Sequence, residues 1–315
     1  MEASRALQWM VLLQKLDGRQ FEATWMYPNV PADQLQVLLF RVNVDRPHHT
    51  ADPYFLKFQD TWVYVSPPTT GSLIAVSSKC FDPEKYATLL RLLVDEYVQP
   101  PSTPLALLRV YLALYTTGQY SNPLQTQATF VWNKNQEMAP YIAGLSLADF
   151  VAKFQDDSAI VWLAILAKKR VVVSSDSFHE LLQITRCLPQ FAWHRQDWSI
   201  LRPFTRLSSL EVTDLHAAGV YIAGVLSSDS HDAPFDVLLD VPHRRVVVHD
   251  SCAALFSGLE WHKECTDFIK RSPTLEAIGK KTSAMIDTLK TSALTSLDAI
   301  QDPLKWSLAV AEELV

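Results

Sequence analysis

The 315 residues are enough for about two domains of ordinary size, each with its own hydrophobic core. Hydrophobic residues make up 48% of the sequence and charged residues 20%, which excludes a chain that is disordered throughout. The 34 acidic residues outnumber the 28 basic ones, so the formal net charge is −6 and we expect no binding to nucleic acid.

The first 118 residues predict a small α/β domain. Two strand-like runs flank Asp17-Gly18, a pair that favours a hairpin because both residues tolerate positive φ. Apolar residues then recur at helical spacing after Pro31, and again after Asp82-Pro83 and Thr103-Pro104. The predicted strands are 6–13, 21–27, 54–58, 62–65 and 73–77. Two strands, a helix, three strands and two helices follow the order of a longin domain, a five-stranded sheet covered by helices.

Periodicity fades between residues 119 and 145, which we interpret as an interdomain linker whose Phe130 and Trp132 pack on a neighbouring element. A second domain begins at Ser146, where Asp149 completes a capping box. A second capping box is predicted at Ser177 and Glu180.

The second domain alternates helices and strands, and this pattern predicts a mostly parallel sheet. Residues 159–167 are apolar on every side, as expected of a buried helix. The predicted strands are 171–173, 199–201, 220–226, 237–241 and 246–249. Strand signals then end, and three helices are predicted at 255–269, 275–297 and 303–314.

Three segments of the second half, Ala164–Asp176, Tyr221–Val225 and Asp236–Val247, resemble the central part of DENN domains. Their order, behind a longin-like half and before a helical tail, matches the three DENN parts along nearly the whole chain. The fold class that the resemblance implies is α/β, with a longin-like N-terminal lobe, a central DENN α/β lobe and a helical downstream segment. Its boundaries are 1–118 for the upstream lobe, 119–145 for the linker, 146–252 for the central lobe and 253–315 for the downstream segment.

A closer resemblance, to one subfamily of DENN proteins, lies in Phe81–Ala87, Tyr141–Gly144, Leu188-Pro189 and above all Trp193–Trp198. The last segment is a hexapeptide bracketed by two tryptophans, and general DENN domains carry another sequence there. The linker departs from the subfamily pattern, and the helical tail is shorter.

The DENN resemblance implies a guanine-nucleotide exchange factor that binds a Rab-family small GTPase and promotes GDP release in late endosomal trafficking. A cytoplasmic protein recruited peripherally to late endosomes is the implied localisation. The alternative that it implies is a non-catalytic scaffold subunit of the Commander endosomal recycling assembly, which binds coiled-coil partners. DENN exchange surfaces have no short catalytic signature, so the resemblance carries over no exchange residue.

The sequence carries no familiar motif for covalent chemistry. It contains no GxxxxGK[ST], GxGxxG, GxSxG or HExxH, so we expect no enzyme with covalent chemistry, no cofactor and no catalytic residue. Asp229, His231 and Asp232 lie in a serine-rich stretch and are interpreted as a solvated loop rather than a metal site, as are His48-His49. The four cysteines form no Cys-x-x-Cys pair, which favours a reducing compartment and inert thiols. The longest apolar run, 159–167, is about half a membrane span, so no membrane insertion is expected.

The partner-binding candidates are Trp193, His194, Arg195, Asp197 and Trp198. Two interpretations stay open for this segment. Either the tryptophans anchor it in the core while Asp197 pairs with Arg195, or its Trp, His and Arg side chains form part of a partner surface, where Trp and Arg are enriched.

Two further features of the sequence can be interpreted either as local structure or as a partner-binding surface. The basic clusters 168–170 and 243–245 are interpreted as solvated charge at the ends of elements, with an acidic partner or lipid headgroups as the alternative. Apolar spacing over 275–289 lasts only two heptads, so we expect this helix to pack on the central lobe rather than on a partner helix.

Overall fold

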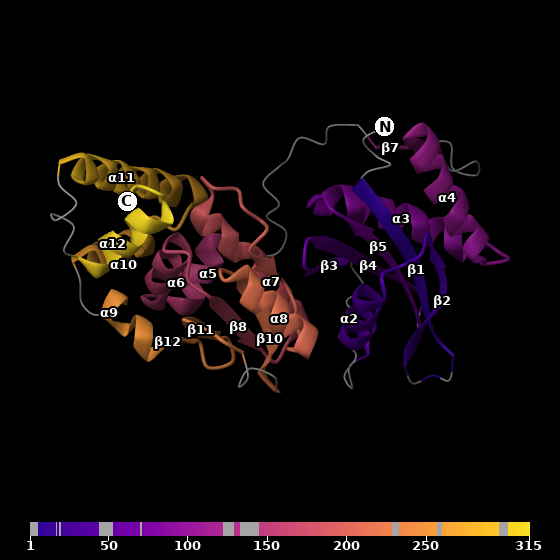
Figure 1. The fold of residues 1–315 in the computed structure, drawn as a ribbon, viewed down its shortest axis with the longest axis horizontal. Coiled ribbons are helices and arrows are strands. Elements are labelled where there is room, and N and C mark those ends of the chain that lie inside the picture. Colours follow the sequence, from indigo (N-terminus) through magenta and orange to yellow (C-terminus); the bar gives the residue numbers. More distant parts are fainter. Residues whose placement is uncertain are drawn as a thin grey trace. The chain divides into compact units, whose positions relative to one another are not determined.

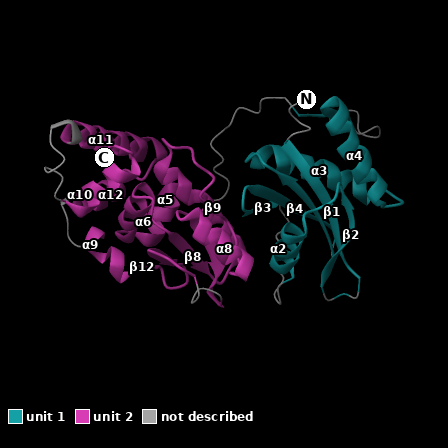
Figure 2. Ribbon diagram, in the orientation of Figure 1, with its two compact units in different colours: residues 1–141 teal, residues 142–315 magenta. Residues whose placement is uncertain are grey.

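The computed structural model divides into two compact units, Met1–Tyr141 and Ile142–Val315 (Figure 2). The structure describes residues 6–16, 18, 20–43, 53–69, 71–121, 129–132, 145–228, 233–256, 260–295 and 302–315. Each unit has its own sheet, so the α/β fold class predicted from the sequence is confirmed.

Unit 1 is built on a five-stranded antiparallel sheet of order β2-β1-β5-β4-β3, the longin-like arrangement predicted above (Figure 1). Its strands are β1 (Leu7–Lys15), β2 (Phe21–Tyr27), β3 (Tyr54–Phe58), β4 (Thr61–Thr69) and β5 (Ser72–Ser78). Its helices are α2 (Ala32–Val42), α3 (Pro83–Val98) and α4 (Pro104–Thr117). All five predicted strands and all three predicted helices are present.

Helices cover both faces of this sheet. Successive side chains of β1 point to opposite sides, so this strand contacts a helix on each face. Trp9 donates its indole N–H to Gln34 of α2 at 2.8 Å, on one face. Gln14 donates to the hydroxyl of Tyr97 in α3 at 3.1 Å, on the other face. Strands covered on both faces need apolar residues at consecutive positions, which explains the unbroken buried run from Trp9 to Leu13.

The described part of the segment predicted as a linker contains a short hairpin, β6 (Gln119–Ser121) and β7 (Thr129–Val131). Trp132 follows β7 and meets the ring of Tyr86 edge-on, with centroids 5.9 Å apart. The ammonium of Lys85 lies 4.4 Å from the centroid of the same indole, and Phe130 contacts it at 6.2 Å. The expected packing of Phe130 and Trp132 is therefore confirmed, while the use of 119–145 as a linker stays a prediction.

Unit 2 is built on a second five-stranded sheet, of order β12-β11-β8-β10-β9. Its strands are β8 (Val171–Ser175), β9 (Leu201–Arg202), β10 (Ile222–Leu226), β11 (Val237–Asp240) and β12 (Arg245–Val248). The first four run parallel and β12 returns antiparallel to β11, so the mostly parallel sheet is confirmed. The helices between and before these strands are α5 (Leu147–Phe154), α6 (Asp157–Leu166), α7 (Phe178–Cys187) and α8 (Ser209–Ala218).

Two local predictions for the sheet region of unit 2 need correction, and one helix was not predicted. The strand expected at 199–201 is the two-residue β9, and α8 was not predicted at all. Ser146 and Asp149 do form the predicted capping box. At the start of α7, Ser177 accepts the N–H of Glu180 as predicted, but the Glu180 carboxylate contacts Lys153 and Ser175.

The last part of unit 2 is helical. It contains a short turn η3 (Asp250–Cys252) and the helices α9 (Ala253–Phe256), α10 (Glu260–Arg271), α11 (Leu275–Thr295) and α12 (Pro303–Ala311). The helix predicted at 255–269 is thus two helices. The apolar spacing on α11 is buried, at Ile278, Thr282, Met285 and Leu289, and the indole N–H of Trp162 in α6 donates to Thr282 at 3.3 Å. This stripe packs inside the unit, as expected.

In the described part of the chain, no helix is both long and apolar enough to cross a bilayer.

Candidate partner-binding site

The tryptophan-bracketed segment 193–198 forms a turn between the 3-10 helix η1 (Leu188–Ala192) and β9. The backbone N–H of Arg195 donates to Ala192 at 3.0 Å, and that of Gln196 donates to Trp193 at 3.2 Å. The rings of Trp193 and Trp198 meet edge-on with centroids 6.0 Å apart. Both tryptophans are half-buried.

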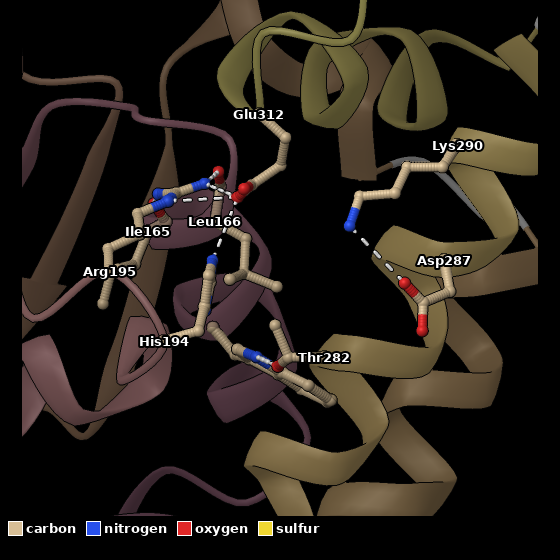
Figure 3. Close-up of polar contacts among 9 residues, drawn as sticks. Ile165, Leu166, His194, Arg195, Thr282, Asp287, Lys290 and Glu312 are labelled. Atoms are coloured by element: carbon tan, nitrogen blue, oxygen red, sulfur yellow. Dashed lines mark hydrogen bonds and ion pairs between the residues drawn. The ribbon is translucent and has the colours of Figure 1, made fainter.

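Arg195 ties this turn to two helices of unit 2 (Figure 3). Its guanidinium donates to the last carbonyl groups of α6, to Ile165 O at 3.1 Å and to Leu166 O at 2.5 Å. The last carbonyls of a helix carry its negative dipole end, so a cation is favourable there, although Ile165 O also accepts the backbone N–H of Lys168 at 3.2 Å. The same guanidinium forms an ion pair with Glu312, which follows α12, with Nε 3.0 Å from Oε1.

The structure differs from the pairing that the sequence suggested inside the segment. Arg195 pairs with Glu312, and the Asp197 carboxylate instead accepts the backbone N–H of Ser199 at 2.8 Å. An Asp side chain that bonds the chain two residues on is a local turn contact and competes with a side-chain partner. No sequence pattern pointed to Glu312, because it lies 117 residues from Arg195.

His194 shares the Glu312 carboxylate with Arg195, its ring Nε2 lying 3.1 Å from Oε1 (Figure 3). Partial burial would raise the pKa of Glu312, but the hydrogen bonds from His194 and Arg195 outweigh it and lower the pKa from 4.5 to about 2. Glu312 is therefore ionised at neutral pH and holds the end of α12 against the turn.

We expect this contact to make stability depend on pH in the acid range. The folded-state pKa of Glu312 lies below its unfolded value, so its contribution is complete above about pH 4.5 and is lost as the pH falls towards 2. In urea unfolding, Glu312→Gln should lower the free energy of unfolding at pH 7 by about 1 to 2 kcal/mol. This is less than the pKa shift alone implies, because solvent screens the partly exposed ion pair. The gap from wild type should narrow as the pH falls below about 4.5 and should close near pH 2.

The neighbouring, exposed Glu313 gives the matched control. Glu313→Gln should leave the unfolding curve unchanged across the same pH range. A gap between wild type and Glu312→Gln that stays constant down to pH 2 would show that the carboxylate charge is not what stabilises the contact.

The two basic clusters lie at opposite ends of the sheet, and each lies beside a carboxylate from outside the cluster. Arg170, before β8, makes a two-pronged ion pair with Asp236, at 2.7 and 3.1 Å. Burial would raise the pKa of Asp236, but hydrogen bonds from Arg170 lower it. At the turn after β11, Asp240 accepts from Arg245 at 2.8 Å and lies 2.9 Å from His243 Nδ1. Local pairing thus uses part of the charge in both clusters.

Neither of the two cysteines whose pKa is shifted is an activated nucleophile. All four are free thiols, and burial raises the pKa of Cys187 and Cys265 to about 12 each. Both are thus protonated at neutral pH, and a protonated thiol is a weak nucleophile.

The remaining metal candidates, Asp229, His231, Asp232 and His48-His49, lie outside the described residues. Within the ranges that the structure describes, no group of three or more His, Cys, Asp or Glu side chains is placed to hold a metal ion.

These observations define a two-unit α/β protein that joins a longin-like sheet to a mostly parallel sheet. Comparison with known proteins gives the family. Residues 145–250 match the SPA family, "Stabilization of polarity axis". The chain is 32% identical over 258 residues to DENN domain-containing protein 10 of Danio rerio, covering 78% of this chain and 73% of that protein. It is 28% identical to the Dictyostelium discoideum protein of the same name, covering 78% and 74%, and 27% identical to the Homo sapiens one, covering 83% and 76%.

The chain belongs to the DENN domain-containing protein 10 family. This confirms the resemblance drawn from Phe81–Ala87 and Trp193–Trp198. The partner-binding role of Trp193, His194, Arg195, Asp197 and Trp198 stays a prediction.

Proposed function

We propose that this protein binds a Rab-family small GTPase and promotes release of its GDP in late endosomal trafficking. The observation that carries the proposal is membership of a DENN family, in a chain whose two units supply the longin-like and parallel sheets that the DENN resemblance predicts. DENN domains act as exchange factors, and the proposal extends that activity to this chain.

The chemistry proposed needs no covalent step. The 315 residues contain only 8 glycines and no phosphate-binding motif, which suits a protein that acts on a nucleotide held by its partner. An exchange factor binds the nucleotide-free GTPase more tightly than the loaded one, and this differential affinity shifts the equilibrium towards release. A thousandfold faster release corresponds to about 4 kcal/mol off the activation barrier.

Recruitment to late endosomes is part of the same proposal and would go through the bound GTPase. A protein with a membrane-attached partner gains local concentration on that surface without inserting a segment of its own. The candidate contact in unit 2 is the turn 193–198, in which Trp193 and Trp198 are half-buried and His194 is exposed.

The proposal predicts faster GDP release from at least one Rab. Each member of a Rab panel is loaded with fluorescent GDP and mixed with micromolar protein and excess unlabelled nucleotide. We expect at least about tenfold acceleration for one Rab or a small group, and none for a small GTPase outside the Rab family. If the turn contacts that Rab, His194→Ala should weaken binding at a temperature where circular dichroism shows the variant fully folded, with only a small fall in melting temperature from the lost contact with Glu312.

Absence of acceleration for every Rab would rule out the exchange activity. Capture of purified coiled-coil subunits of the Commander assembly in the same preparation would then favour the scaffold function. His194→Ala that lowers the melting temperature, with Rab binding unchanged, would assign the turn to stability alone.

A further inference from the structure

Helix α4 of unit 1 carries an apolar stripe that the described residues of its unit leave exposed. Its inner side buries Leu107, Val110, Tyr111 and Leu114. Its outer side carries Leu105, 70% exposed, Leu112, 41% exposed, and Tyr115, 51% exposed. No other helix or strand in the described ranges has as many large exposed hydrophobic residues. A helix that is apolar all round is normally buried, so the exposed outer side of α4 is typical of a surface that binds a partner.

The stripe has one charge at its middle, Arg109, whose side chain is 56% exposed. Leu105, Arg109, Leu112 and Tyr115 follow one another four, three and three residues apart, so they line one side of the helix over about 15 Å. Arg109 forms an ion pair through Nη2 with the buried carboxylate of Glu96, and its guanidinium carbon lies 6.0 Å from the centroid of the Tyr120 ring. A guanidinium has five N–H donors, so it can also bind a second carboxylate from the solvent side.

Aromatic contacts continue this surface towards the sheet. The ring of Tyr115 stacks on Tyr111 with centroids 6.1 Å apart, and Tyr111 meets Tyr27 at the end of β2 edge-on, 5.2 Å away. Tyr27 is itself 37% exposed. Rings held by one another lose little freedom on binding, which favours affinity at a docking surface.

We propose that the α4 stripe, defined as Leu105, Arg109, Leu112 and Tyr115, docks an amphipathic helix of a partner protein that carries an acidic residue amid its apolar side chains. Charge complementarity selects this occupant, because α4 has no acidic residue and its one cation lies between apolar ones. The spacing selects a helix, because side chains repeating every three or four residues form the ridges that pack into another helix. The inference does not depend on nucleotide exchange.

Synthetic peptides test it against the full chain, with anisotropy of a labelled peptide as the readout. The first peptide is an amphipathic helix of about 20 residues with leucines at helical spacing and one glutamate in the apolar side. In the second peptide lysine replaces that glutamate, and in the third a central proline prevents the helix. We expect the glutamate peptide to bind at least about tenfold more tightly than the lysine peptide, and the proline peptide not to bind.

Variants of the protein locate the site. Leu105→Ser and Leu112→Ser should each weaken binding of the glutamate peptide about tenfold, with the far-UV circular dichroism unchanged. Leu16→Ser is the matched control, since Leu16 is a leucine 62% exposed but off the stripe, and it should leave binding unchanged. These variants leave Arg109 and its contact with Glu96 in place.

Four results would overturn the proposal. The first is no saturable binding of the glutamate peptide to wild type. The second is equal binding of the lysine peptide, which removes the role of Arg109. The third is equal binding of the proline peptide, which points to an extended segment on the open edge of β2. The fourth is a dimer in sedimentation that Leu112→Ser dissociates, which assigns the stripe to a second copy of the chain.

Discussion

Replacing Gly224 with alanine should destabilise unit 2 by about 3 kcal/mol or more. Gly224 lies in β10, a central strand, and a Cβ atom there would sit 2.2 Å from the carbonyl oxygen of Pro203. It would also lie 3.0 Å from Thr185 Cγ2 and 3.1 Å from Leu181 Cδ1. A side chain can turn away, but the Pro203 carbonyl belongs to the backbone. That backbone is held close by the N–H of Thr205, which donates to Gly224 O at 2.8 Å.

Urea unfolding followed by tryptophan fluorescence measures the effect, and Gly279→Ala is the matched control. Gly279 lies in α11 with no heavy atom within 4 Å of its added Cβ, so this variant should gain about 0.5 to 1 kcal/mol from helix propensity. A Gly224→Ala protein as stable as wild type would show that the Pro203 backbone moves freely, contrary to the packing described.

Unit 1 was predictable because its signals are local. The hairpin turn at Gly18 has the positive φ, 71°, that the Asp-Gly pair favours. The Asp82 carboxylate accepts the N–H of Lys85 and starts α3 at Pro83, as its sequence indicated. Each of these signals involves residues at most three apart, so a single sequence suffices to recognise it.

Helix α8 was missed because too few of its residues are buried, and one of the two that are is charged. Only Glu211 and Leu215 of its ten residues are buried, so no apolar stripe marks it. A local signal was nevertheless present, since Ser208 and Glu211 form a full capping box. The neighbouring strand β9 has two residues, too few for an alternating pattern, and its place at the sheet edge comes from pairing with β10.

The candidate site was predictable in its residues but not in its partners. The pair of tryptophans directed attention to 193–198, and they do contact each other. Sequence proximity suggested Asp197 as the partner of Arg195, whereas the structure uses Glu312 and the end of α6. Contacts between residues more than a hundred positions apart depend on how helices pack, which hydrophobic spacing does not encode. The α4 stripe was missed for the converse reason, because a helix with apolar residues on two sides suggests burial on both.

The second large effect is expected at the ion pair between β9 and α8. Arg202 donates to Asp214 through Nε at 2.7 Å and through Nη2 at 3.4 Å, and to Ser199 O at 2.7 Å. The two side chains are only 5% and 9% exposed. Asp214→Ala would leave a guanidinium buried without its counter-charge, and we expect it to lower the free energy of unfolding by about 3 to 5 kcal/mol.

A double variant separates the pair's own contribution from the cost of breaking it. Arg202→Met with Asp214→Leu removes both charges, and it should recover most of the stability lost in Asp214→Ala, because desolvating two charges offsets much of their attraction. Glu276→Ala, at a largely exposed ion pair with Lys280, should change stability by less than about 0.5 kcal/mol. A double variant as unstable as Asp214→Ala would mean that shape and hydrogen bonding at this position, rather than an unpaired charge, join β9 to α8.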